Sequence, residues 1–150
     1  MTTTVGGDLE LTDPRDFCLV DVGHGHAYAV LRGYPPVDED GDAGPAGPVM
    51  DVVFAGVERI SCWSDVGPIR VRRADESERQ RIADGLGGKI RRSSAVFLLE
   101  DGSIASYVIA SRVYWAEFDL PYDAVSPLAS EDAAYREDNP PVGGVIRFAD

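Results

Sequence analysis

The sequence has little of the chemistry that marks an enzyme. It contains two histidines, two cysteines and a single lysine among its 14 basic residues. We find no GxSxG element, no HExxH helix and no Gly-rich loop ending in Lys-Ser/Thr, which excludes the serine-hydrolase, zinc-peptidase and P-loop patterns. Cys18 and Cys62 do not form a CxxC pair, and buried thiols are their expected state in a reducing compartment. No cofactor and no metal are therefore expected.

Long hydrophobic runs are also missing. No stretch of about 18 apolar residues occurs, so no segment is expected to span a membrane. The first residues carry Asp8 and Glu10 before any hydrophobic stretch, whereas a secretory signal has a basic start and an apolar core. We therefore expect a cytoplasmic protein without a membrane partner.

The sequence is rich in acidic residues. Its 26 acidic and 14 basic residues give a formal net charge of −12, yet 44% of the 150 residues are apolar, enough for one folded domain over 1–150. Residues 1–66 hold 12 acidic and 3 basic residues, 67–112 hold 6 and 9, and 113–150 hold 8 and 2. Such a field favours a protein partner with a basic surface and opposes the binding of nucleic acid.

The hydrophobic pattern predicts an α+β fold. We expect a mainly antiparallel, twisted sheet of six or more strands and one short helix near 75–86. Whether the sheet is partly closed, as in a barrel, is not decided by the pattern. Asp75 and Glu78 have the spacing of a capping box at the start of that helix. Residues 1–15 are expected to be a loosely structured N-terminal segment. Strands are expected at 17–22, 26–32, 49–60 with a bend at Gly56, 69–73, 95–100, 103–110, 112–119 and 142–148.

The segment 95–118 is expected to form three consecutive, neighbouring strands. The first two are joined by a tight turn at Asp101–Gly102. In a one-sided strand, only one of Val53 and Phe54 faces the core. That side chain is expected to pack in one cluster with Phe97, Tyr107, Ile109, Trp115 and Phe118.

Residues 33–48 are rich in Gly, Pro and acid, which predicts an exposed, flexible loop. Within it, four carboxylates occupy five positions: Asp38, Glu39, Asp40 and Asp42. A calcium loop would need alternating carboxylates and another at the twelfth position, and this segment lacks that spacing. Two interpretations remain, a solvated linker and a mobile acidic arm that engages a basic partner surface.

Two other groups of residues admit a chemical interpretation. His24 and His26 are two positions apart in an extended segment and can share one ion, with Asp21 or Asp51 as a third ligand, but a solvated turn is simpler. Basic residues on either side of the predicted helix can contact phosphate or be solvated, and no stacking aromatics lie among them: Arg70, Arg72, Arg73, Lys89, Arg91 and Arg92. We favour the solvated interpretation for both groups.

Two segments carry a resemblance to a known class of protein. The strand VVFAGVERI at 52–60 and the stretch AVFLLEDGSIASYVIASRVYWAEF at 95–118 resemble the small acidic β-rich immunity proteins of bacterial toxin systems. The resemblance implies an inhibitor that occludes a toxin, often a basic nuclease. An acidic inhibitor meets a cationic surface with electrostatically steered association. Here the acidic arm would steer, and two aromatic anchors, Tyr34 and Tyr122, would slow dissociation.

Two alternatives stay open. One is a small ligand-binding β-barrel or enzyme, which would need a convergent polar cluster in its lumen that the sequence does not show. The other is a structural or interaction module of a larger bacterial or phage assembly, which the native mass of the purified protein would reveal. The sequence thus favours a non-enzymatic binding protein of the immunity kind.

Overall fold

A computed structural model describes residues 2–23, 27–36, 47–100 and 106–150 of the protein. Within them, ten strands form one mixed, mostly antiparallel sheet with two short α-helices, which confirms the α+β class and the sheet of six or more strands. The strands are β1 Thr3–Gly6, β2 Leu11–Val22, β3 Tyr28–Tyr34, β4 Val49–Ala55, β5 Arg59–Ser61, β6 Asp65–Arg73, β7 Ala95–Leu99, β8 Tyr107–Ala110, β9 Arg112–Phe118 and β10 Val145–Ala149. The helices are α1 Glu76–Gly85 and α2 Ala133–Asp138, with 3-10 helices η1 Pro127–Ala129 and η2 Val142–Gly144. No helix in this described part is long and apolar enough to pass through a membrane.

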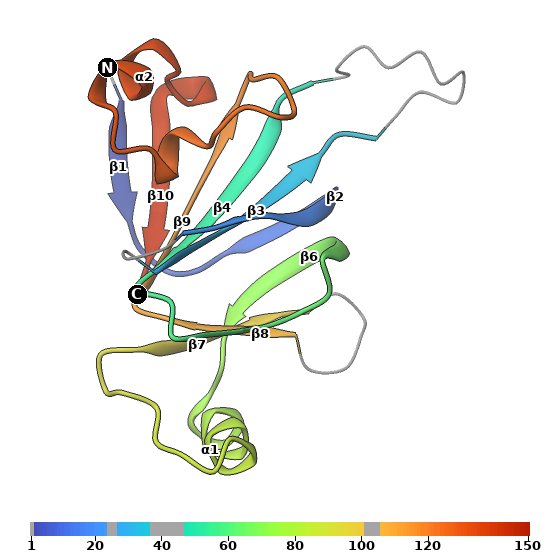
Figure 1. The fold of residues 1–150 in the computed structure, drawn as a ribbon, viewed down its shortest axis with the longest axis vertical. Helices are drawn as coiled ribbons and strands as arrows, with labels where there is room; N and C mark the ends of the chain where they lie inside the picture. The colour runs from blue at the N-terminus through green and yellow to red at the C-terminus, as the bar shows by residue number, and fades with distance from the viewer. Residues whose placement is uncertain (1, 24–26, 37–46, 101–105) are drawn as a thin grey trace.

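The sheet is strongly bent, and its two halves enclose the largest of its hydrophobic clusters. The strand order is β1-β10-β9-β4-β3-β2-β6-β7-β8-β5, and β1 and β10 form a parallel pair whereas the other neighbours are antiparallel. Over the described residues the ladder ends at β1 and at β5, so the sheet is not closed. Strands β1, β10, β9, β4 and β3 fan out in the upper part of Figure 1, while β7 and β8 cross below them with α1 beneath.

The sheet bends sharply at Gly56. Between the last β4–β9 pair and the first β5–β8 pair lie three residues on one strand, 56–58, but only two on the other, 110–111. The extra residue is a bulge, and bulges bend a sheet and increase its twist. Gly56 has a φ of 65°, a left-handed conformation that glycine adopts without steric cost. The bend expected at Gly56 is therefore confirmed.

We expect Gly56→Ala to destabilise the protein more than Gly67→Ala does. Both glycines have a φ of 65°, and a left-handed conformation costs a residue with a Cβ about 1–2 kcal/mol. A Cβ at Gly56 would also lie 2.3 Å from Oγ of Ser111, whereas a Cβ at Gly67 would have no neighbour within 4 Å. Urea unfolding measures both losses, and Ser111→Ala in the Gly56→Ala background should recover part of the difference. Equal losses at the two glycines would show that Ser111 moves aside freely.

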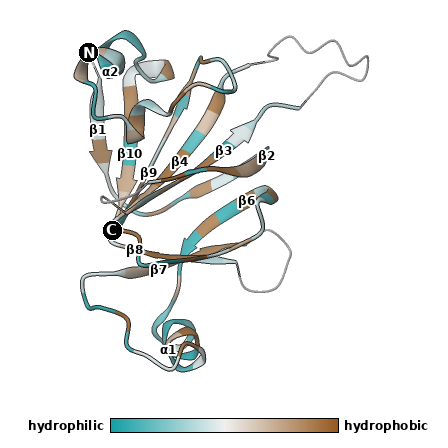
Figure 2. Cartoon of the chain, in the orientation of Figure 1, coloured by the Kyte–Doolittle hydropathy of each residue, from teal (hydrophilic) through white to brown (hydrophobic). Residues whose placement is uncertain are grey.

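Apolar side chains fill the space inside the bend and also cover parts of its outer face. In Figure 2 the strands carry the brown, hydrophobic stretches, and α1 shows more teal. On the outer face, α1 and its flanks pack on β7 and β8, and residues 120–128 pack on β4 and β9. The main core contains Phe17, Leu31, Val52, Phe54, Ile69, Val71, Phe97, Val108 and Trp115.

The prediction of a single cluster is wrong because this sheet is covered on both faces. Val53 and Phe54 are therefore both buried, with 2% and 0% exposure, although they point to opposite sides of β4. The expected members divide among three clusters: Phe54, Phe97 and Trp115 in the main core, Phe118 beneath residues 120–128, and Tyr107 with Ile109 beneath α1.

The expectation of a loosely structured N-terminal segment at 1–15 is also wrong. Strand β1 adds to β10, and β2 already begins at Leu11. Neither shows a regular apolar pattern, because all four residues of β1 are exposed at the sheet edge and Pro14 lies where the β2–β6 register is irregular. Similarly, Gly33 and Tyr34 belong to β3 and are not part of the expected loop 33–48.

The three strands of 95–118 do not form a meander. Strand β8 pairs with β7 and β5, whereas β9 pairs with β4 and β10, because the chain bends at Ser111 between them. The antiparallel pairing of β7 with β8 is confirmed. The turn expected at Asp101–Gly102 lies outside the described residues.

The helix prediction is confirmed, including its cap. Asp75 is the N-cap of α1, and the backbone N–H of Glu78 donates to its Oδ1 at 2.8 Å. In return, the N–H of Asp75 donates to Oε1 of Glu78 at 3.0 Å. The two bonds form the capping box that the sequence spacing predicted.

Candidate functional site

Tyr34 and Tyr122 meet at the end of β3, just before the acidic segment. Tyr34 is the last residue of β3, and Tyr122 lies in the segment that follows β9. Their rings pack edge to face, with centroids 5.0 Å apart and an interplanar angle of 67°. Tyr34 is half-buried, and Tyr122 keeps 38% of its surface exposed. The two predicted anchors thus form one aromatic pair, which we call the tyrosine platform.

A buried ion pair holds the tyrosine platform in place. Arg32 and Asp51 face each other on β3 and β4, with side chains 2% and 0% exposed. The guanidinium donates from Nε to Oδ1 of Asp51 at 2.7 Å and from Nη2 to Oδ2 at 2.8 Å. Its Nη1 donates to the carbonyl oxygens of Tyr122 at 3.0 Å and Ala124 at 2.6 Å. Arg32 therefore ties the segment that carries Tyr122 to the sheet.

The charges beneath the platform are fixed by this arrangement. Burial by itself lowers the pKa of Arg32, but the hydrogen bonds and the charge of Asp51 more than offset burial, so that the pKa is raised. Burial also raises the pKa of Tyr34, and the nearby charge of Arg32 only partly opposes that rise. Arg32 is therefore charged and paired, and the phenol of Tyr34 is neutral at pH 7.

Carboxyl groups lie beside the platform. Asp16 is opposite Tyr34 in the β2–β3 ladder, and Asp65 is opposite Cys18 in the β2–β6 ladder. Loss of water contact, a hydrogen bond with Asp65 and the charge of Asp65 raise the pKa of Asp16. Burial and the same two carboxyls raise the pKa of Cys18, so its sulfur is a neutral thiol at pH 7 and a poor nucleophile. An aromatic pair with an acidic rim suits a cationic side chain, which is attracted to both.

The structure places only part of the predicted site. The arm residues Asp38, Glu39, Asp40 and Asp42 lie outside the described residues, as do His24 and His26. Asp51, weighed as a metal ligand, is bound to Arg32, and Asp21 accepts a hydrogen bond from Tyr28 Oη at 3.0 Å. In the described part of the chain, no group of three or more His, Cys, Asp or Glu residues is arranged to hold a metal ion.

No protein-family model matches the chain, and neither the curated proteins nor the solved structures give a match. Function is therefore inferred from the site itself, which consists of an aromatic pair, an acidic rim and a buried ionic anchor.

The ionic anchor is the feature that sequence reasoning missed. Arg32 is the one charged residue in YAVLRGY, and Asp51 is the one charged residue in VMDVVFA. A base and an acid in the middle of two apolar strands, each buried on both faces, indicate a cross-strand pair. That signal was present, but it becomes decisive only when the two strands are known to be neighbours.

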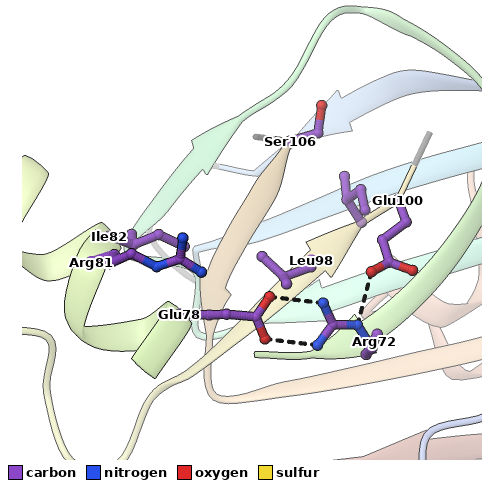
Figure 3. Close-up of a pocket in the computed structure, with 8 residues that line it drawn as sticks. Arg72, Glu78, Arg81, Ile82, Leu98, Glu100 and Ser106 are labelled. Carbon is purple, nitrogen blue, oxygen red and sulfur yellow. Dashed lines mark hydrogen bonds and ion pairs between the residues drawn. The ribbon is translucent and has the colours of Figure 1, made fainter. Parts of the chain in front are cut away.

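A second candidate site is the cleft between α1 and strands β6 and β7 (Figure 3). Its volume is about 370 Å³, and Arg72 is one of its lining residues. The guanidinium donates from Nη1 and Nη2 to Glu78 at 2.8 Å each, and from Nε to Glu100 at 2.9 Å. Because these carboxylates already engage Arg72, we interpret the cleft as a joint that fastens α1 to the sheet.

The ion pair between Arg72 and Glu78 makes the stability of the folded state depend on pH. Hydrogen bonds from Arg72, followed by the backbone N–H of Asp75, lower the pKa of Glu78 from 4.5 to about 2. Ionised Glu78 therefore stabilises the folded state fully above pH 4.5, and the contribution is lost as the pH falls through about 2. We expect Glu78→Gln to be destabilising at pH 7 and the difference from wild type to shrink between pH 4.5 and pH 2, measured by denaturant unfolding. The exposed neighbour Glu76 provides the control Glu76→Gln, and a difference that does not change with pH would contradict the prediction.

Proposed function

We propose that the protein is a non-enzymatic binding protein of the immunity or antitoxin kind, which occludes a partner protein with a basic surface. The observation that supports this proposal is the tyrosine platform, in which Tyr34 comes shortly before the acidic segment in the sequence. Tyrosines held rigidly and partly exposed are typical anchors of protein interfaces, because they bury a large area at a small entropy cost. The Arg32–Asp51 pair supplies that rigidity here.

In this proposal, one group of residues attracts the partner and another group makes the close contacts with it. Residues 1–66 carry 12 acidic and 3 basic residues, and this charge attracts a basic partner from a distance. The tyrosine platform then makes the short-range contacts, including cation–π contacts with Arg or Lys of the partner. Charge should therefore govern the association rate, and the tyrosines should govern the dissociation rate.

The test uses the protein partner recovered from native cells, with the product of a neighbouring gene as the first candidate. Association and dissociation rates are measured by surface plasmon resonance at 0.15 M and 1 M salt, where the screening length falls from about 8 Å to about 3 Å. Changing Asp38, Glu39, Asp40 and Asp42 to Asn or Gln should slow association and weaken its salt dependence. Tyr122→Ala should leave association almost unchanged and speed dissociation.

A matched control removes four charges elsewhere. Glu76, Asp84, Glu137 and Asp138 are exposed and lie outside residues 1–66, the segment whose charge is proposed to attract the partner. Their amides should leave association much closer to wild type than the amides of the acidic arm do. If both quadruple variants behave alike, only net charge matters and the arm has no special role. If no basic partner binds and Tyr122→Ala has no effect on any recovered complex, the proposed function is wrong.

A further inference from the structure

At the far end of β4 from the tyrosine platform, the structure gathers positive charge around a cavity. This cavity has a volume of about 610 Å³ and is lined by Arg73, Arg92 and Arg112. Arg73 ends β6, Arg112 begins β9, and Arg92 lies in the segment before β7. In the described part of the chain, Asp150 is the one acid in the lining. A protein with a formal charge of −12 thus concentrates three arginines at one hollow.

Asp150 already shows how an anion sits in this cavity. Nη1 of Arg73 donates to its carbonyl oxygen at 2.8 Å, and Nε of Arg112 donates to its Oδ1. Arg112 is further oriented by the ring of Phe148, whose centroid lies 4.6 Å from its Cζ. Arg92 has no ion-pair or hydrogen-bond partner among the described residues. Arg112 therefore binds the side-chain carboxylate of Asp150, Arg73 binds its main-chain oxygen, and Arg92 remains available.

A second cavity adjoins the basic one. This neighbouring cavity of about 720 Å³ shares Ala55, Gly56 and Tyr114 with it and extends past Tyr28 to Leu128. The first cavity is lined mainly by arginine and serine, whereas the second has Tyr28, Tyr114 and aliphatic side chains, with Ser130 and Glu131 among its other lining residues. A ligand that fits both parts has an anionic group at one end and a planar, partly apolar group at the other.

We infer that the two adjoining cavities together bind a small organic phosphate with an aromatic group, its phosphate held by Arg73, Arg92 and Arg112 and its ring lying along Tyr114. Arginine suits this role because its planar guanidinium donates to phosphate oxygens in pairs. Ser111 also lines the basic cavity, next to Gly56, and its hydroxyl adds a neutral donor. The side-chain carboxylate of Asp150 competes with the phosphate for Arg112. This site is separate from the tyrosine platform and does not depend on the proposed partner.

The test is a calorimetric titration of the full chain with adenosine monophosphate, inorganic phosphate and adenosine. The monophosphate should bind most tightly, inorganic phosphate more weakly, and adenosine most weakly of all. Arg92→Gln should weaken binding of the monophosphate by about tenfold, as expected for the loss of a charge-assisted hydrogen bond. Asp150→Asn should strengthen binding several-fold, because it removes the competing carboxylate.

Arg70→Gln is the matched control, since Arg70 is an exposed arginine of β6 that points to Glu100 at 3.8 Å. It should leave the affinity unchanged, and unchanged thermal unfolding of Arg92→Gln shows that the variant is folded. Failure of both phosphates to bind, even to Asp150→Asn, would overturn the inference. Equal binding of inorganic phosphate and the monophosphate would overturn the aromatic half of it, and equal losses in Arg92→Gln and Arg70→Gln would overturn the assignment of the arginines.

Discussion

Asp51→Asn is expected to destabilise the protein by about 3–5 kcal/mol, the usual cost of leaving one partner of a buried ion pair without its counter-charge. Arg32 is 2% exposed and cannot move its guanidinium into water without unpacking β3 and residues 120–128. Its bonds to the carbonyl oxygens of Tyr122 and Ala124 cannot replace the lost charge. Denaturant unfolding at pH 7 measures the change.

The control for this prediction is a surface pair. Glu117 is 39% exposed and lies 3.3 Å from Arg15, so Glu117→Gln should cost less than about 1 kcal/mol. The double variant Arg32→Met/Asp51→Leu should recover much of the loss, because it removes both charges together. It should still release Tyr122 and weaken partner binding. A loss below 1 kcal/mol for Asp51→Asn would mean that water reaches the guanidinium.

Phe97→Ala is expected to cost about 3–5 kcal/mol, the range for deleting a fully buried aromatic ring. Phe97 is 0% exposed and lies in the main core, where its ring centroid is 5.7 Å from that of Phe54. Because β6, β7 and β8 enclose it from one side and β4 from the other, the cavity cannot collapse easily. Thermal or denaturant unfolding gives the loss directly.

The same substitution at a half-buried ring provides the comparison. Phe148 lies on β10, next to the edge strand β1, and packs against Tyr114, so Phe148→Ala should cost clearly less than Phe97→Ala. Adding Phe54→Ala to Phe97→Ala should give a non-additive loss, with a coupling of about 0.5–1.5 kcal/mol. Strict additivity would show that the two rings do not support each other.

Sequence reasoning succeeded where neighbours along the chain decide the structure. Asp75 and Glu78 are three residues apart and define the start of α1, and Gly56 marks the bend through its own backbone. It failed where the decision is made by distant strands. Nothing between 103 and 118 shows that the chain changes partners at Ser111, because the partner of β9 is β4, which lies far earlier in the sequence.

The candidate site shows the same limit. Tyr34 and Tyr122 were each selected from the sequence as aromatic anchors, but their contact depends on how residues 120–128 cross the sheet. The bonds that direct this crossing come from Arg32, whose role follows from the β3–β4 register alone. Similarly, Arg73 and Arg92 were placed in two separate basic clusters, and only the fold brings them to one cavity.

Asp51 has a consequence for the chain before folding is complete. Strand β4 reads VMDVVFA and is buried on both faces, so it is the kind of short apolar segment that pairs with other copies of itself. Its partner β9 is synthesised much later, whereas β3, which carries Arg32, has already left the ribosome. Self-pairing of β4 would bury an uncompensated carboxylate, as a gatekeeper residue does, while pairing with β3 neutralises it. The ion pair thus favours pairing of β4 with β3 over pairing of β4 with a second copy of itself.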